Sequence, residues 1–137
     1  VIFCTGREDF ILDGIGANEK RPYRAAVLQN GCEALSWITG TGCMAGALTA
    51  AFSAVSNPFE ACILAAATMG IAGEKAAMGA KGPGSFRAEL LDALFYLSGQ
   101  EQEFCSSLRL GLYEKQLIVG EREDGWKLTV FTPGFRP

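Results

Sequence analysis

The distribution of apolar residues divides the chain into strand-like runs followed by helix-like segments. Residues 1–4 form a short apolar run without polar alternation, which is typical of a strand buried on both faces. Two further runs, residues 10–12 and 25–28, predict strands, and the polar residues 14–24 between them predict a long hairpin loop. A brief extended segment is expected at residues 37–38, before the helical part begins.

Three alanine-rich or amphipathic segments follow and predict helices at residues 42–55, 58–77 and 86–98. Asn57 is a favourable N-cap for the second helix, and Pro58 suits its first helical position. Ser85 is expected to cap the third helix, and Gly99 is expected to end it. Strands followed by packed helices indicate an α/β fold.

The C-terminal part has a different pattern. We expect residues 1–99 to form part of one domain and leave residues 100–137 unassigned. Within this tail, two apolar runs flank Asp124-Gly125, which favours a hairpin turn, so a β-hairpin is expected there. The uncharged residues 34–59 are long enough to cross a bilayer. Their many hydroxyl and glycine residues favour a buried helix instead, and we expect no membrane partner.

Composition excludes several classes of function. The 137 residues contain no histidine, which rules out Ser-His-Asp and Cys-His nucleophiles and histidine metal ligands. A net charge of −3 and scattered basic residues argue against a nucleic-acid partner. The five cysteines include no CxxC pair, so we assign no metal-ligating side chain. Reduced thiols and the lack of a signal-like start predict a cytoplasmic location, and the opening without methionine suggests a fragment.

The strongest chemical signal is Thr39-Gly40-Thr41-Gly42-Cys43, a glycine loop that leads into a predicted helix. Its glycines let the backbone pass close to a ligand, and the free amides at a helix start favour a phosphate. We therefore expect Thr41 and Gly42 to bind phosphate. The spacing fits neither the dinucleotide-binding G-x-G-x-x-G pattern nor a P-loop. A glycine turn that merely starts a helix remains the alternative.

Two neighbouring features are further candidates. Cys43 stands in the first turn of the predicted helix, where the dipole favours a thiolate that could act as a base or nucleophile. Its alternative role is that of a small buried apolar residue. Thr5-Gly6 ends the first strand, and the carboxyl ends of strands form the ligand crevice in open α/β sheets. Residues 81–85 form a second, weaker glycine-rich approach to a helix.

Several blocks of the sequence occur together in a characteristic order: Thr5-Gly6 with Asp9, Asn30-Gly31, and residues 39–44, 70–76 and 81–87. Together they resemble the hydroxyethylthiazole kinase family, which acts in thiamine salvage and belongs to the ribokinase-like superfamily. The resemblance covers roughly residues 1–98. It implies a ribokinase-like three-layer α/β fold, of which this chain would be the C-terminal part.

The resemblance also implies a reaction and its residues. ATP, with Mg²⁺, would phosphorylate the hydroxyl of 4-methyl-5-(2-hydroxyethyl)thiazole in a homotrimer with active sites at subunit boundaries. Thr5, with Gly6 beside it, matches an ATP-contacting position, and Gly40 matches a substrate-contacting position. Cys43 matches the position at which related sugar kinases carry an aspartate base. Because the family's N-terminal part is absent, we expect the isolated chain to lack a complete active site.

Two other interpretations stay open at this stage. One is a different ribokinase-like kinase for a vitamin precursor, and the other is a non-catalytic remnant.

Overall fold

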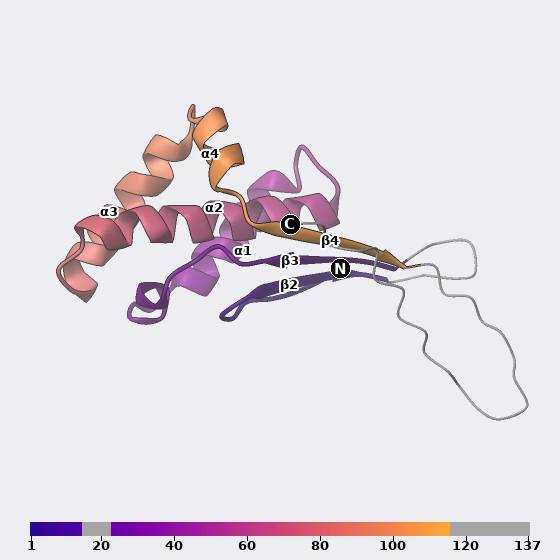
Figure 1. The fold of residues 1–137 in the computed structure, drawn as a ribbon, viewed down its shortest axis with the longest axis horizontal. Coiled ribbons are helices and arrows are strands. Elements are labelled where there is room, and N and C mark those ends of the chain that lie inside the picture. Colours follow the sequence, from indigo (N-terminus) through magenta and orange to yellow (C-terminus); the bar gives the residue numbers. More distant parts are fainter. Residues whose placement is uncertain (15–22, 116–137) are drawn as a thin grey trace, which may run out of the picture.

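A four-stranded sheet forms one side of the molecule in the computed structural model, which describes residues 1–14 and 23–115 (Figure 1). The strands are β1 (Ile2–Cys4), β2 (Asp9–Asp13), β3 (Tyr23–Leu28) and β4 (Leu110–Lys115). Their order in the sheet is β1-β2-β3-β4, and every neighbouring pair is antiparallel. β4 follows the five described helices along the chain, yet it lies beside β3 (Figure 1).

The helices between β3 and β4 are η1 (Glu33–Ser36), α1 (Thr41–Phe52), α2 (Pro58–Gly79), α3 (Pro83–Leu97) and α4 (Glu101–Ser107). α2 is the central helix, because it packs against α1, α3 and α4 and also against β2 and β3. In Figure 1 it runs across the middle of the molecule, with the sheet on one side of it and α4 on the other. The prediction of an α/β fold is therefore confirmed.

Local sequence explains where α2 begins. The Asn57 side chain accepts hydrogen bonds of 3.1 Å from the amides of both Phe59 and Glu60, and Pro58 occupies the first turn. These groups satisfy amides that have no partner inside the helix. The predicted cap is confirmed. α2 is long and apolar enough to cross a membrane by length and composition alone. Its place between the sheet and the other helices accounts for that apolar character.

The two faces of the sheet differ in exposure. Ile11, Ala26 and Leu28 are fully buried on the face that packs against α2. On the opposite face Ile2 and Leu12 are paired across β1 and β2, and about half of each side chain is exposed. The prediction that residues 1–4 are buried on both faces is wrong. β1 is an edge strand of the described sheet, and an apolar run cannot by itself distinguish an edge from a centre.

Two boundaries near the strands also differ from the predictions. Tyr23 and Arg24 belong to β3 rather than to the loop before it. Arg24 is held there by an ion pair with Asp13 on the neighbouring strand, and its guanidinium lies 4.6 Å from the centre of the Phe59 ring. The other part of that loop, residues 15–22, lies outside the described residues.

Residues 37–38 do not form the extended segment that the sequence pattern predicts. Trp37 has helical backbone angles, φ −74° and ψ −21°, and follows η1 directly. Its ring meets Phe86 of α3 edge-on, with ring centres 6.3 Å apart. This contact across more than forty residues favours a turn that no local pattern reveals.

The start of α3 differs as well. α3 begins at Pro83, three residues earlier than predicted, so Ser85 lies in its first turn rather than at the cap. The Ser85 hydroxyl accepts hydrogen bonds from the amides of Lys81 (2.9 Å) and Gly82 (3.2 Å). The hydroxyl thus supports the helix start from inside the helix. Gly99, with φ +99°, follows its end as expected.

The tail contributes directly to the fold. Residues 101–115, which the sequence pattern left unassigned, form α4 and β4. Arg24 of β3 is paired with Glu114 of β4 along the last antiparallel ladder. The β-hairpin expected within residues 117–131 lies outside the described residues.

Candidate phosphate-binding site

A cleft of about 790 Å³ opens where the ends of two strands meet the start of α1. β1 and β3 are both antiparallel to β2, so they run in the same direction and end at the same edge of the sheet. The residues that follow these strands and begin α1 line the cleft: Thr5, Gly6, Asn30, Gly31, Thr41 and Gly42. The two predicted phosphate-loop residues and the two predicted ATP-binding residues therefore share one cavity.

The start of α1 is open for a ligand. Gly40 precedes the helix with φ +106°, a left-handed conformation that favours glycine. The Thr41 hydroxyl donates a hydrogen bond of 3.2 Å to the Leu35 carbonyl and fixes the loop. Across residues 1–14 and 23–115, no hydrogen bond uses the backbone amides of Thr41, Gly42 and Cys43. Unpaired amides at a helix N-terminus are the feature that binds phosphate.

Gly40 and Cys43 flank the lining residues without belonging to them. Cys43 occupies the first turn of α1 and is exposed, which excludes its alternative role as a buried apolar residue. Both residues are direct chain neighbours of the Thr41-Gly42 pair that lines the cleft. A ligand that reached the helix start would therefore lie close to both.

Charged groups of both signs line the same cleft. Arg7 supplies a cation, and Asp9 and Glu33 supply carboxylates. Oδ1 of Asp9 accepts a hydrogen bond of 3.1 Å from the Gly6 amide. Burial raises the pKa of Asp9, and this hydrogen bond opposes the rise in pKa only in part.

The second glycine-rich segment takes no part in the cleft. Residues 81–85 are absent from its lining, and the amides of Lys81 and Gly82 are already bonded to the Ser85 hydroxyl. The structure therefore supports the simpler interpretation, in which this segment connects α2 to α3.

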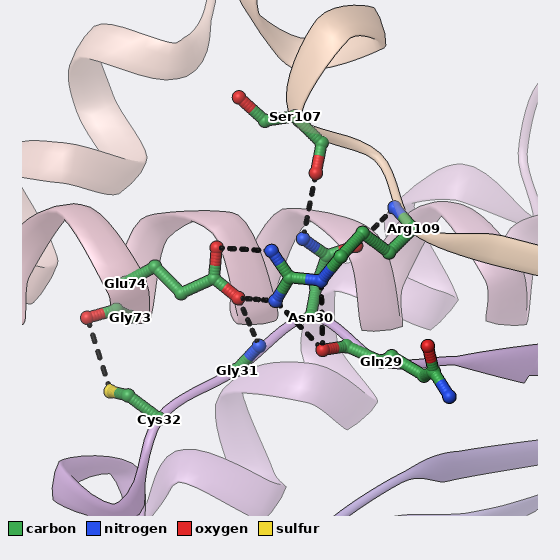
Figure 2. Close-up of polar contacts among 8 residues, drawn as sticks. All are labelled: Gln29, Asn30, Gly31, Cys32, Gly73, Glu74, Ser107 and Arg109. Atoms are coloured by element: carbon green, nitrogen blue, oxygen red, sulfur yellow. Dashed lines mark hydrogen bonds and ion pairs between the residues drawn. The ribbon is translucent and has the colours of Figure 1, made fainter.

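The opposite wall of the cleft rests on residues that the sequence pattern did not single out as functional. The Asn30-Gly31 turn lies on α2, where a side chain at Gly70 would meet the Asn30 backbone at 2.7 Å. Glu74 and Arg109 bind the same turn from α2 and from the residue before β4 (Figure 2). The recurrence of small residues along α2 is a signal for close approach, whereas no local pattern marks Arg109.

Comparison with known proteins identifies the family. The model of the hydroxyethylthiazole kinase family matches residues 1–100. The chain belongs to the hydroxyethylthiazole kinase family.

Individual family members agree with this assignment. The chain is 42% identical to the hydroxyethylthiazole kinase of Methanocorpusculum labreanum over 113 aligned residues. This alignment covers 82% of this chain and 39% of that protein. The Pyrococcus furiosus enzyme of the same name is 40% identical over 103 residues, 75% of this chain and 36% of that protein.

A solved structure shares the fold. The hydroxyethylthiazole kinase of Pyrococcus horikoshii superimposes with a TM-score of 0.71 at 39% identity, over 81% of this chain and 40% of that chain. The chain thus has the fold of the corresponding part of a ribokinase-like thiazole kinase. It spans about two fifths of the length of the relatives that it matches.

Proposed function

We propose that the protein containing this chain transfers the γ-phosphoryl group of ATP to the hydroxyl of 4-methyl-5-(2-hydroxyethyl)thiazole. Membership of the family supports the reaction class. The observation that carries the proposal is the row of unpaired amides from Thr41 to Cys43 at the edge of a cleft that also contains Thr5 and Gly6.

The proposed division of labour follows from the chemistry of phosphoryl transfer. This reaction depends on positioning and charge stabilisation more than on covalent chemistry. The amides of Thr41 and Gly42 would stabilise negative charge on the transferred group. Thr5 and Gly6 would contact ATP from the end of β1, and Gly40 would contact the thiazole alcohol.

Cys43 is the proposed catalytic residue. Its exposed thiol follows directly after the two amides that line the cleft, so it would lie near the attacking hydroxyl. A thiol is a poor match for an alcohol proton, so we expect it to orient the hydroxyl or accept its proton late. Such a role contributes about 10- to 100-fold to turnover.

ATP is the co-substrate in this proposal, and Mg²⁺ would accompany its phosphates. Mg²⁺ prefers one or two carboxylates together with substrate phosphates. Asp9 and Glu33 are the carboxylates that line the cleft, so their donor chemistry fits the ion. Within the part of the chain that the structure describes, His, Cys, Asp and Glu form no cluster of three or more that could hold a metal. From this chain the ion would take one or both of these carboxylates, and when bound beside the phosphates it would neutralise charge on the transferred group.

Location and assembly complete the proposal. We propose a cytoplasmic enzyme, in keeping with reduced thiols, and a homotrimer, in keeping with the resemblance to the family. Apolar side chains on the exposed sheet face, Ile2, Phe10 and Leu12, leave surface available for further contacts. Light scattering of the purified complete protein tests the assembly, and a monomer would contradict it.

The reaction is tested by incubating the complete natural protein that contains these 137 residues with γ-labelled ATP and Mg²⁺. The acceptors are the thiazole alcohol and, in parallel, pyrimidine and pyridoxal alcohols. Transfer of label to the thiazole alcohol supports the proposal. Transfer to another acceptor instead supports a different vitamin-precursor kinase. Absence of transfer, together with a melting temperature unchanged by millimolar ATP, indicates a non-catalytic remnant.

The role of Cys43 is tested in the same assay. Cys43→Ala is expected to lower turnover about 10- to 100-fold with little change in the KM for ATP. Cys105→Ala is the matched control, since Cys105 is an exposed cysteine on α4 that does not line the cleft. Unchanged turnover in Cys43→Ala removes the thiol from the mechanism.

A further inference from the structure

The turn between β3 and η1 is held by groups from distant parts of the chain. The Gly31 amide donates a hydrogen bond of 2.6 Å to Oε1 of Glu74, which lies on α2. The same carboxylate forms an ion pair with the guanidinium of Arg109 (Figure 2). One carboxylate therefore connects the turn, the central helix and the segment that leads into β4.

Arg109 binds the turn directly as well. Its Nη2 donates to the Gln29 carbonyl at 2.8 Å, and its backbone amide donates to Oδ1 of Asn30 at 2.7 Å. The side-chain nitrogen Nδ2 of Asn30 in turn donates to the Ser107 carbonyl at 2.9 Å (Figure 2). Asn30 is only 4% exposed, so these partners replace the water that a buried amide would otherwise need.

The same turn is a wall of the cleft. Gln29, Asn30 and Gly31 line it, whereas Glu74 and Arg109 do not. Gly31 has φ +137°, a conformation that glycine adopts at little cost, and without a Cβ atom its backbone has other conformations open to it unless its amide is held. Gln29 also donates a hydrogen bond of 2.8 Å from Nε2 to Glu8 and so joins this wall to the segment that contains Thr5 and Gly6.

We propose that Glu74 and Arg109 are positioning residues that set the shape of the nucleotide-facing wall of the cleft through the Gln29–Gly31 turn. The inference rests on the proposed function for its substrate. It assigns a role in the site to Arg109, which lies beyond residue 100, where the match to the family model ends. The pair acts by restricting the turn before ATP arrives, because a preorganised site loses less freedom on binding.

The chain offers a matched control for this proposal. Lys75 is the neighbour of Glu74 on α2, and it forms a 2.8 Å ion pair with Glu103 of α4. That pair also ties α2 to the segment before β4, yet neither residue contacts the turn or lines the cleft. A role limited to holding α4 against α2 would give Lys75→Ala and Arg109→Ala the same consequences.

The experiment compares Glu74→Gln, Arg109→Ala and Lys75→Ala in the complete natural protein, with two readouts. We expect Glu74→Gln and Arg109→Ala to raise the KM for ATP about tenfold with a smaller change in kcat. We also expect hydrogen exchange at the Gly31 amide, followed by NMR, to accelerate by about tenfold or more in Arg109→Ala. Lys75→Ala should leave both quantities at the wild-type value.

A conservative variant separates charge from geometry. Arg109→Lys keeps the positive charge but lacks the planar fork that reaches both Gln29 and Glu74. We therefore expect its KM for ATP and its exchange rate at the Gly31 amide to lie between those of Arg109→Ala and the wild type. A wild-type KM for ATP in both Glu74→Gln and Arg109→Ala overturns the proposal, and so does an equal effect of Lys75→Ala.

The two proposals fail in different ways. If the wild-type protein transfers no phosphoryl group, the proposed function fails, and the Gly31 exchange rate alone then decides whether the pair holds the turn. If the wild-type protein is active and the variants keep a normal KM for ATP, the positioning role fails while the proposed function stands.

Discussion

Gly70 of α2 lies directly beneath Asn30: a Cβ atom added at Gly70 would stand 2.7 Å from the carbonyl carbon, the oxygen and the Cβ of Asn30. This approach is closer than any real Cβ contact, so the turn that forms one wall of the cleft rests on the bare backbone of the helix. The shape of the cleft therefore depends on the absence of a side chain at Gly70 as well as on the groups that line the cleft.

Gly70→Ala should both destabilise the protein and displace this turn. The new methyl group meets rigid backbone, so we expect the free energy of unfolding to fall by about 1–3 kcal/mol. Gly46→Ala is the matched control, because Gly46 is also inside a helix and its added Cβ meets nothing within 4 Å. Gly46→Ala should raise stability by about 0.5–1 kcal/mol. Urea unfolding measures both, and equal effects would contradict the close approach at Asn30.

Four of the five cysteines should fall into two classes of reactivity toward a thiol reagent. Cys4, Cys43 and Cys105 are exposed, whereas Cys62 is buried and its pKa is raised by that burial. Thiolates are the reactive form, so we expect Cys62 to be labelled only when the protein unfolds. Mass spectrometry after brief labelling with and without urea identifies the sites. Fast labelling of Cys62 in the folded protein would contradict its place in the core.

Ligands should protect Cys43 selectively. If ATP and the thiazole alcohol occupy the cleft, labelling of Cys43 should slow, because the helix start beside it is covered. Cys105 serves as the internal control in the same sample, since it is exposed on α4. Equal labelling of both residues with and without ligands would place Cys43 outside the occupied site.

The ionisation of Asp9 should make stability depend on pH. Burial raises its pKa in the folded protein above the value of 3.8, so the folded state binds this proton more tightly than the unfolded state. This contribution to stability is present at low pH and is lost as pH rises through the folded pKa. Asp9→Asn removes the charge and keeps an oxygen that can accept from the Gly6 amide.

Relative to wild type, Asp9→Asn should therefore gain stability as pH rises from about 3 to 7. Urea midpoints of the two proteins at several pH values measure this difference. If the wild-type protein instead gains stability relative to Asp9→Asn as pH rises, the folded structure stabilises the charged carboxylate of Asp9, which would contradict the raised pKa.

Features that depend on neighbouring residues were predictable from the sequence. Asn57 and Pro58 define the start of α2 within one turn, and the observed cap follows directly from them. The glycine loop before α1 was predictable for the same reason, because unpaired amides are a property of any helix start. The part of the cleft formed by Thr5 and by Thr41-Gly42 was thus accessible to sequence reasoning.

Features that depend on distant partners were not predictable. The apolar run of β1 does not reveal that the strand lies at an edge, and the helical turn at Trp37 depends on packing against Phe86. β4 is stabilised by pairing with β3, more than seventy residues earlier. Arg109 contacts Gln29 across 80 positions of the chain, so the second wall of the cleft emerges only in three dimensions.

The most direct test of the whole account follows the backbone amides at the start of α1. The complete natural protein, labelled with ¹⁵N, is titrated with ATP and Mg²⁺ while its amide resonances are recorded. The account predicts saturable shifts at Thr41, Gly42 and Cys43, and no comparable shift at Gly46 one turn further along α1. Bound ATP that leaves the three amide resonances unmoved would contradict it.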